Sequence, residues 1–359
     1  MGRFLNIRKV LFFKKKVKVL VGMSGGVDSS VTAQLLLDKD FEVAGATLCL
    51  CGINDEKNCS DAAQVCSRLG IPHFIYDFKN EFSKYVSGIF SQQYINGKTP
   101  NPCIECNKNI KFGKMISAAI DAGYDKIATG HYARIKKDEN GRYLLLRAKD
   151  DTKDQSYVLY MLTQKQLSHS IFPLGELTKT QVREIAQNND FVNADRPDSQ
   201  DICFVPDGDY ASFIEKNTDF VSSEGNYVDI LGNTLGKHKG VIHYTIGQRK
   251  GLGIALGKPA FVIEKDCLTN TVVLGDEEYL FKKEVIVENV NFIPFDKLTS
   301  EMQVTAKLRY RHNAQPAVII PLEENKVKIV FEEPQRAPSP GQAAVFYDGD
   351  IVVGGGTII

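Results

Sequence analysis

Cys103 and Cys106 lie three residues apart in the stretch NPCIECN, which spans residues 101–107. Two thiols at this spacing can supply half of a zinc site, form a redox pair, or place one reactive thiol beside a helper. A structural zinc ion normally takes four ligands, and the sequence has no second CxxC motif to complete such a set. The stretch alone does not decide between a redox pair and a single reactive thiol.

The residues around these two cysteines predict the start of a helix. Asn101 is a favourable N-cap, and Pro102 suits the first helical position. Cys103 and Cys106 would then lie in the first turns, where the helix dipole lowers the pKa of a thiol. The ammonium group of Lys111 would act in the same direction. We therefore expect reactive thiolates at this helix start.

A second chemical signal is the glycine loop SGGVDSS at residues 24–30, directly after the apolar run VKVLVG at 17–22. This order predicts a strand, a loop and a helix. Gly25 and Gly26 let backbone N–H groups approach an anion closely, and the helix N-terminus adds partial positive charge. The loop lacks the GxxxxGK[ST] pattern of a Walker A motif. Asp28 beside a bound phosphate predicts a Mg²⁺ ion between the two.

The elements that must position these groups alternate between strands and helices. Further strands are expected at 41–50, 73–78 and 125–135, with helices between them. This alternation predicts a parallel sheet covered by helices on both faces, with a ligand site at the carboxyl ends of the strands.

The pattern changes after about residue 208, where glycines and turn signals crowd in, and alternating strands dominate from about 280. We predict an α/β fold with a small central domain and a C-terminal β-barrel after the parallel-sheet domain. The expected boundaries are a basic N-terminal arm at 1–16, a catalytic domain at 17–208, the central domain at 209–278 and the barrel at 279–359.

The composition limits the classes of function. The 44 basic and 44 acidic residues give a formal net charge of zero, which excludes a uniformly basic nucleic-acid binder but leaves local basic patches open. No apolar run approaches the ~18–20 residues that cross a bilayer, so no membrane partner is expected. Eight cysteines are few for this length, which predicts a reducing, cytoplasmic compartment.

The loop SGGVDS resembles the PP-loop of ATP pyrophosphatases, the adenine nucleotide alpha hydrolase-like group that cleaves ATP between the α and β phosphates. Further stretches resemble, in chain order, the tRNA-specific 2-thiouridylases. They are TPNPCIECNKNIKFG, ATGHYARI, KDQSYVLYML, DSQDICFV, HYTIGQRKGLG, LRYR and SPGQAAVFYDGD. The resemblance runs from about residue 17 to the C-terminus. It implies a tRNA-uridine 2-sulfurtransferase that uses ATP and Mg²⁺ to replace the 2-oxygen of the wobble uridine (U34) of tRNA with sulfur.

The resemblance also implies roles for individual residues. Cys203 would carry a persulfide, loaded by a sulfur-donor protein such as a persulfide relay or a cysteine desulfurase, and Cys106 would form a transient disulfide with it. The implied ATP-binding residues are Gly22, Met23, Ser24, Gly25, Gly26, Val27, Asp28, Ser29, Leu48 and Gly130. The region beside the target base would be Asn101, Pro102 and Cys103. The implied tRNA contacts are His131, Lys153, Asp154, Gln155, Arg309, Tyr310 and Gln342.

Cys103 departs from the family pattern, because most members have aspartate there. Together with Cys106 and Cys203 it makes a set of three thiols, which with one open iron position is how a [4Fe–4S] cluster could present a sulfide. Two alternatives to the persulfide route therefore stay open. One is the same reaction on such a cluster. The other is a PP-loop ligase or amidotransferase acting on a small metabolite, which would leave Cys106 and Cys203 without a role.

Overall fold

A computed structural model describes residues 16–359, except 54, 195, 197–201 and 324. The predicted basic arm at 1–16 lies, but for its last residue, outside the described residues. In the described part of the chain, no helix has both the length and the apolar character needed to span a membrane.

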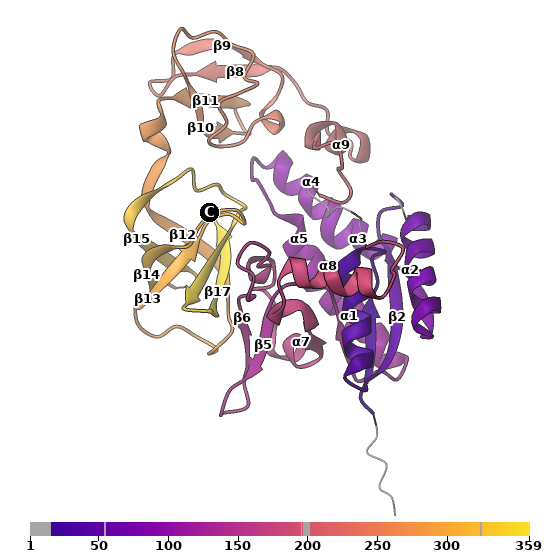
Figure 1. The fold of residues 1–359 in the computed structure, drawn as a ribbon. Helices are drawn as coiled ribbons and strands as arrows, with labels where there is room; N and C mark the ends of the chain where they lie inside the picture. The colour runs from indigo at the N-terminus through magenta and orange to yellow at the C-terminus, as the bar shows by residue number, and fades with distance from the viewer. Residues whose placement is uncertain (1–15, 54, 195, 197–201, 324) are drawn as a thin grey trace, which may run out of the picture.

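A five-stranded parallel sheet, in the order β3-β2-β1-β4-β7, forms the centre of the N-terminal part (Figure 1). Its strands are β1 (Lys18–Gly22), β2 (Glu42–Cys49), β3 (His73–Asp77), β4 (Lys126–Ala128) and β7 (Ser170–Ile171). The sheet is buried on both faces because residues of β1 alternate between two hydrophobic clusters. Val19 and Val21 point to one cluster, and Leu20 points to the other.

Helices supply both clusters. The face of Val19 packs against α1 (Val27–Asp38), α2 (Asp55–Leu69) and α8 (Lys179–Asn188). The face of Leu20 packs against the π-helical turn Cys106–Lys114 and α6 (Met115–Asp121). The remaining helices of this part are α3 (Lys79–Phe82), α4 (Gly88–Ile95), α5 (Pro102–Glu105) and α7 (Gln164–Ser168).

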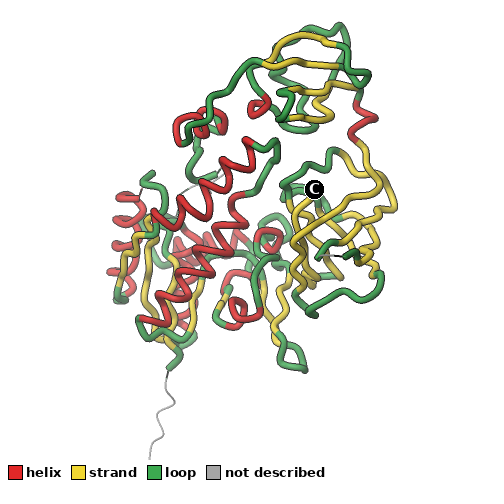
Figure 2. Tube along the Cα trace, turned by 180° about the vertical axis from the view of Figure 1, so that it is seen from behind, coloured by secondary structure: helices red, strands yellow, loops and turns green. Residues whose placement is uncertain are grey.

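The two later parts of the chain are built mainly from strands (Figure 2). After α9 (Tyr210–Asn217), a four-stranded sheet has the order β10-β11-β8-β9. Its strands are β8 (Gly225–Val228), β9 (Thr234–His238), β10 (Phe261–Asp266) and β11 (Thr271–Gly275). This sheet is the predicted central domain, and together with the closed last sheet described next it confirms the predicted α/β fold.

That last sheet closes because β12 pairs with both β15 and β17, so the order β12-β15-β14-β13-β16-β17 forms a ring. The ring strands are β12 (Phe281–Phe292), β13 (Met302–Lys307), β14 (Gln315–Pro321), β15 (Val327–Arg336), β16 (Ala343–Asp348) and β17 (Ile351–Ile358). A hairpin from the N-terminal part, β5 (Arg134–Lys137) and β6 (Tyr143–Leu146), extends this sheet beyond β17.

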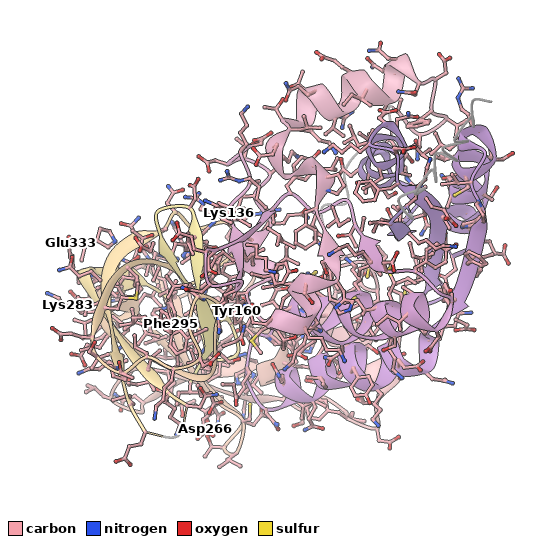
Figure 3. All side chains as sticks on the ribbon, turned by 90° about the horizontal axis from the view of Figure 1, so that it is seen from below. Lys136, Tyr160, Asp266, Lys283, Phe295 and Glu333 are labelled. Carbon is pink, nitrogen blue, oxygen red and sulfur yellow. The ribbon has the colours of Figure 1, made fainter. Side chains whose placement is uncertain are left out.

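The barrel and the N-terminal part share one hydrophobic cluster. Tyr160 belongs to it and lies at the boundary between the two parts (Figure 3). The Asn291 side chain donates to the Tyr160 carbonyl at 2.7 Å, and the Tyr157 hydroxyl donates to the Ala343 carbonyl at 2.8 Å. The backbone of Thr99 also donates to the Pro340 carbonyl at 2.8 Å. The barrel is thus fixed against the elements that carry the cysteines.

Gly341 lies in close contact at this junction, and its replacement tests the junction. A Cβ at Gly341 would lie 2.8 Å from Lys98 Cβ and 2.9 Å from the Thr99 nitrogen, at a φ of +89°. A Cβ at Gly349, at a φ of +53°, would meet no described atom within 4 Å. We expect Gly349→Ala to cost about 1–2 kcal/mol of unfolding free energy from its backbone alone, and Gly341→Ala roughly 2 kcal/mol more from the contact. Urea unfolding measures both, and equal losses would contradict a tight junction.

Candidate functional site

The glycine loop joins β1 to α1 as the sequence predicted. Gly25 has a φ of +72°, and a Cβ there would lie 3.1 Å from the Asn58 carbonyl oxygen and 3.2 Å from Arg196 Nη1. The Ser29 hydroxyl accepts from the Ser24 N–H at 3.2 Å and donates to the Gly26 carbonyl at 2.9 Å. These bonds shape a loop in front of the N-terminus of α1, where free N–H groups favour an anion.

Asp28, on the first turn of α1, is held by two groups that the sequence did not reveal. Its carboxylate accepts from Lys179 Nζ at 2.8 and 2.9 Å and from the Tyr132 hydroxyl at 2.9 Å. Lys179 is the first residue of α8, so this ion pair joins two helices beside the loop. The arrangement places one positive charge next to the expected phosphates.

Gly130 lies at the carboxyl end of β4, directly against the same turn. A Cβ at this position would lie 2.9 Å from the carbonyl carbon and the Cβ of Asp28, and 3.0 Å from the Ser29 nitrogen. Only glycine therefore allows this loop to pass so close to α1. The implied ATP-binding residues Gly130 and Asp28 are brought together.

The far side of the glycine loop is braced by the segment after α8. The Asn193 side chain donates to the Gly25 carbonyl at 2.9 Å and to the Ser30 hydroxyl at 3.0 Å. Arg196 Nη1 donates to the same Gly25 carbonyl at 3.0 Å and pairs with Asp61 at 2.9 Å. Sequence reasoning missed both residues, because no motif marks a brace that comes from about 170 residues away.

The cysteines gather beside the carboxyl end of β2. Cys106 is buried in a cluster that includes Phe204, the neighbour of Cys203, and Leu48 and Cys51 pack against that cluster. Cys103 and Cys203 are exposed, and Cys51 is half-buried. The structure therefore brings the two predicted reactive thiols into one neighbourhood and adds Cys51, which the sequence did not single out as reactive.

The predicted helix start at the first cysteine pair is confirmed. The Asn101 side chain accepts from the Cys103 N–H at 3.1 Å, and Pro102 is the first residue of α5. The π-helical turn then begins at Cys106. The backbone at this point widens from α-helical to π-helical geometry, which is frequent at functional sites.

The expected lowering of the thiol pKa values at this helix start is wrong. Burial raises the pKa of Cys106 to about 11, and the nearby Lys111 ammonium opposes this only in part. The surrounding protein atoms also raise the pKa of Cys103. The physical reason is desolvation: the cost of ionising a thiol among apolar groups exceeds what the helix start and Lys111 offer.

Cys51 and Cys203 share a side-chain hydrogen bond, and it separates their pKa values. This hydrogen bond raises the pKa of Cys203, and the protein atoms around its sulfur and the neighbouring Cys106 raise it further, although the residue as a whole is exposed. Acceptance of the bond lowers the pKa of Cys51 to about 7 against the opposing effect of burial, and the Ile53 N–H also donates to Cys51. The pair therefore favours ionisation of Cys51 before Cys203.

This ionisation gives a direct prediction. Cys51 is expected to react with iodoacetamide with a midpoint near pH 7, because alkylation follows the thiolate fraction, which rises with pH through the pKa. Cys203→Ser keeps a hydroxyl donor and should preserve this midpoint, whereas Cys203→Ala should raise it toward the ordinary value of 9.0. Timed alkylation with peptide mass spectrometry measures the midpoint. An identical midpoint in both variants would show that the hydrogen bond does not set it.

The metal hypotheses find no support in this geometry. Within the described part of the chain, no three His, Cys, Asp or Glu side chains lie in an arrangement that could hold a metal ion. This applies to the set Cys103, Cys106 and Cys203, all of which are described. The [4Fe–4S] alternative and a zinc site at CIEC are therefore not carried further.

The implied tRNA contacts from the KDQ stretch turn out to be largely engaged inside the protein. Asp154 is buried and accepts from the Ser156 hydroxyl at 2.8 Å and the Ala148 N–H at 3.0 Å. Gln155 accepts from the Tyr132 N–H at 3.0 Å, so it supports the tyrosine that contacts Asp28. Lys153 is half-buried. Through Gln155 and Tyr132, the stretch thus supports Asp28 beside the glycine loop.

His131 also serves the interior. It is buried, and its Nδ1 shares a 2.7 Å hydrogen bond with the Thr129 hydroxyl. Its ring packs near Phe112 and Phe172. Burial holds the pKa of His131 well below its ordinary value, so it is neutral.

The barrel residues implied in tRNA binding lie at the junctions between the parts of the chain. Arg309 donates to the Ile246 and Ala337 carbonyls at 3.2 and 3.0 Å, which links the barrel to the central sheet. Gln342 donates to the Thr99 carbonyl at 2.6 Å. Tyr310 is exposed and lines a cavity of about 370 Å³. That cavity also includes Arg147, Asp151, Lys307 and Arg311. The roles of these residues in tRNA binding stay predictions.

Three protein-family models together match nearly all of the described residues. A model described as tRNA methyl transferase HUP domain matches residues 17–207, more than half of the chain. Models described as tRNA methyl transferase PRC-barrel domain and Aminomethyltransferase beta-barrel domain match residues 211–276 and 282–358. A tRNA-specific 2-thiouridylase of Acetivibrio thermocellus is 52% identical over 96% of this chain and 99% of its own length. The chain belongs to the tRNA-specific 2-thiouridylase family.

A second 2-thiouridylase, from Clostridioides difficile, is 50% identical over 97% of this chain and 99% of its own length. The family resemblance drawn from the motifs is thereby confirmed. Among solved structures, an NMN synthetase from Francisella tularensis is 18% identical with a TM-score of 0.36, over 52% of this chain and 68% of that chain. A likeness at that level carries no argument about function. The 2-thiouridylase family uses a PP-loop, which accords with ATP binding at the glycine loop.

Proposed function

We propose that this protein thiolates the wobble uridine of tRNA at C2, using ATP. The observation that carries the proposal is that the glycine loop and the cysteines lie at the same edge of the parallel sheet, where its strands end. The glycine loop follows β1 there, and Leu48 near the end of β2 and Cys51 just after it pack against the cluster around Cys106. An ATP-activating loop and a set of thiols on one edge suit the activation of a carbonyl oxygen followed by attack of sulfur.

The nucleotide half of the reaction uses the glycine loop. The N–H groups of Gly25 and Gly26 and the hydroxyls of Ser24 and Ser29 would bind the leaving pyrophosphate. The uridine 2-oxygen attacks the α-phosphorus, and pyrophosphate leaves. Mg²⁺ arriving with ATP would neutralise charge on the phosphates, and Asp28 offers the carboxylate oxygens that this ion prefers. The ammonium group of Lys179 would add a fixed positive charge.

The sulfur half uses two thiols. The terminal sulfur of a persulfide on Cys203 attacks C2 of the adenylated uridine, and AMP leaves. The Cys106 thiol then attacks Sγ of Cys203, the S–S bond to the transferred sulfur breaks, and 2-thiouridine leaves with a proton restored to it. A disulfide between Cys106 and Cys203 remains and must be reduced by an external dithiol. The exposure of Cys203 suits loading by a sulfur-donor protein, and a reducing cytoplasm suits the eight free cysteines.

The test is ATP cleavage that depends on the tRNA base. With Mg²⁺ and ATP, we expect AMP and pyrophosphate release to require a tRNA transcript with uridine at the wobble position, and nucleoside mass spectrometry to detect 2-thiouridine when a persulfide source is added. A transcript that differs only by cytidine at that position is the matched control. Equal release with the cytidine transcript, or release stimulated by a small amine or acid without tRNA, would refute the proposal.

A further inference from the structure

Cys51 is a neighbour of Cys203, the residue that carries first the persulfide and then the disulfide in the proposed reaction. It follows β2 by two residues, and its side chain shares a hydrogen bond with the Cys203 thiol. It packs on the same hydrophobic cluster that buries Cys106 and includes Phe204. Cys51 and Cys106 also interact electrostatically, so the three sulfur atoms share one neighbourhood. The proposed reaction gives Cys51 no role.

The three thiols differ in exposure and in ionisation. Cys106 is buried and stays protonated, with a pKa of about 11. Cys51 is half-buried and ionises near neutral pH, while Cys203 is exposed. A thiol whose pKa lies near the ambient pH is the best attacker in thiol–disulfide exchange. A disulfide that includes Cys106 has one sulfur atom out of reach of a reductant, whereas a disulfide between Cys51 and Cys203 has neither sulfur fully buried.

We propose that Cys51 is a third reacting thiol, which takes over the disulfide on Cys203 from Cys106 after each sulfur transfer. The inference rests on the proposed function, since that reaction generates the disulfide. The Cys51 thiolate attacks Sγ of Cys203, a Cys51–Cys203 bond forms, and the Cys106–Cys203 bond breaks. Cys106 leaves as a thiolate and takes up a proton, and no electrons enter or leave the protein. An external dithiol then supplies two electrons to the new disulfide and is itself oxidised.

Burial makes Cys106 a slow leaving group, because a thiol of high pKa leaves less readily. Contact between the attacker and its target offsets this, because the exchange is intramolecular and needs no encounter. The apolar cluster around Cys106 then keeps the released thiol protonated, which slows the reverse attack.

Neighbouring cysteines do not offer the same geometry. The Cys59 thiol lies 3.8 Å from that of Cys49, where a shared hydrogen bond and burial raise the pKa of Cys49 to about 11. Cys103 interacts with Cys203 only through its charge, and its own pKa is raised. Among the described cysteines, Cys51 alone combines the contact with Cys203 and the thiolate form. Cys59→Ser is therefore the matched control for Cys51→Ser.

The first experiment is a single turnover of the full-length protein without reductant. The protein is loaded with polysulfide, desalted, and mixed with ATP, Mg²⁺ and a tRNA transcript. Acid quenching, alkylation and peptide mass spectrometry then map the disulfide, while nucleoside mass spectrometry counts the 2-thiouridine formed. We expect the wild type and Cys59→Ser to carry Cys51–Cys203. Cys51→Ser should give the same first burst of 2-thiouridine but retain Cys106–Cys203. With dithiothreitol as the dithiol, its later turnovers should slow roughly tenfold.

A second experiment keeps the inference separate from the proposed function. One equivalent of diamide, a thiol oxidant, is added to the protein without ATP or tRNA, and the disulfide is mapped again. We expect Cys51–Cys203 in the wild type and Cys106–Cys203 in Cys51→Ser and in Cys51→Ala. If no 2-thiouridine forms but this map holds, the proposed function fails and the thiol exchange stands. Cys106–Cys203 as the final wild-type disulfide in both experiments, or undiminished repeated turnover by Cys51→Ser, would overturn the inference.

Discussion

Cys203→Ser is expected to stop the formation of 2-thiouridine, with a loss of at least ~10³-fold because the variant has no atom that can carry the transferred sulfur. The same variant should still activate the base, since the glycine loop and its braces are untouched by the change. Pyrophosphate should therefore appear in a burst that matches the bound tRNA. Rapid-quench measurement of pyrophosphate alongside nucleoside mass spectrometry separates the two half-reactions.

Cys267→Ser is the control for this prediction, because Cys267 is half-buried at the end of β10 and belongs to the hydrophobic cluster of the central sheet. It should thiolate tRNA at the wild-type rate. Normal 2-thiouridine formation by Cys203→Ser would mean that sulfur reaches the base by another route. Loss of the pyrophosphate burst along with the thiolation would mean that Cys203 acts before sulfur transfer.

Asp28→Asn should lower the rate of AMP formation by roughly 10²–10³-fold. The change removes the negative charge that pairs with Lys179 at 2.8 Å, and it leaves the proposed Mg²⁺ ligand as one neutral oxygen. Lys179 is nearly buried, with 11% of its side chain exposed, so its charge loses a partner that water cannot fully replace. The Tyr132 hydroxyl can still donate to the amide oxygen, so the effect comes from the lost charge. AMP formation at saturating tRNA, measured over a range of Mg²⁺ concentrations, tests the effect.

Two comparisons show how Asp28 acts. Asp190→Asn removes an exposed carboxylate from an ion pair with Arg68, at a φ of 49° that asparagine tolerates, and should change neither activity nor stability appreciably. In a double-mutant cycle with Lys179→Met, an effect of Asp28 that runs only through Lys179 would make the double variant no slower than the slower single variant. If the two losses of rate instead add in full, Asp28 acts independently of Lys179, as a ligand of Mg²⁺ would. Wild-type activity of Asp28→Asn would contradict both roles.

The sequence contained the information for most of the fold and for the start of the site. The strand, glycine loop and helix at 17–38 follow from local pattern, as does the N-cap of Asn101 with Pro102 behind it. These features depend on residues that are neighbours in the chain. The second helix shows the limit even at short range. Serine favours the N-cap position, yet α2 begins at Asp55 and Ser60 lies inside it.

The side chains that hold the site residues in place come from distant parts of the chain, so the sequence alone could not identify them. Lys179 meets Asp28 across 151 residues, and Asn193 meets Gly25 across 168. Cys51 meets Cys203 because the exit of β2 faces the chain after α8. No single-sequence pattern encodes such a meeting, since each side chain alone looks like an ordinary surface group.

The error over the thiol pKa values has the same origin. The helix dipole is visible from the sequence, but the apolar cluster that surrounds Cys106 is assembled from α3, α4 and the chain around Phe204. The desolvation from that cluster exceeds the stabilisation of a thiolate by the helix start. The reactive thiolate is consequently found at Cys51, where a donor thiol and a backbone N–H converge.

The β5–β6 hairpin has a consequence for the integrity of the molecule. It comes from the N-terminal part of the chain, yet Leu146 pairs with Ile351 of β17, and the Arg134 guanidinium binds Asp350 at 2.6 Å. The N-terminal part and the C-terminal barrel are thus interlocked, while β8 to β11, between them in the chain, form their own sheet to one side (Figure 1). A protease that nicks the fully exposed turn at Leu268 would therefore yield two fragments that remain one particle until a denaturant separates them.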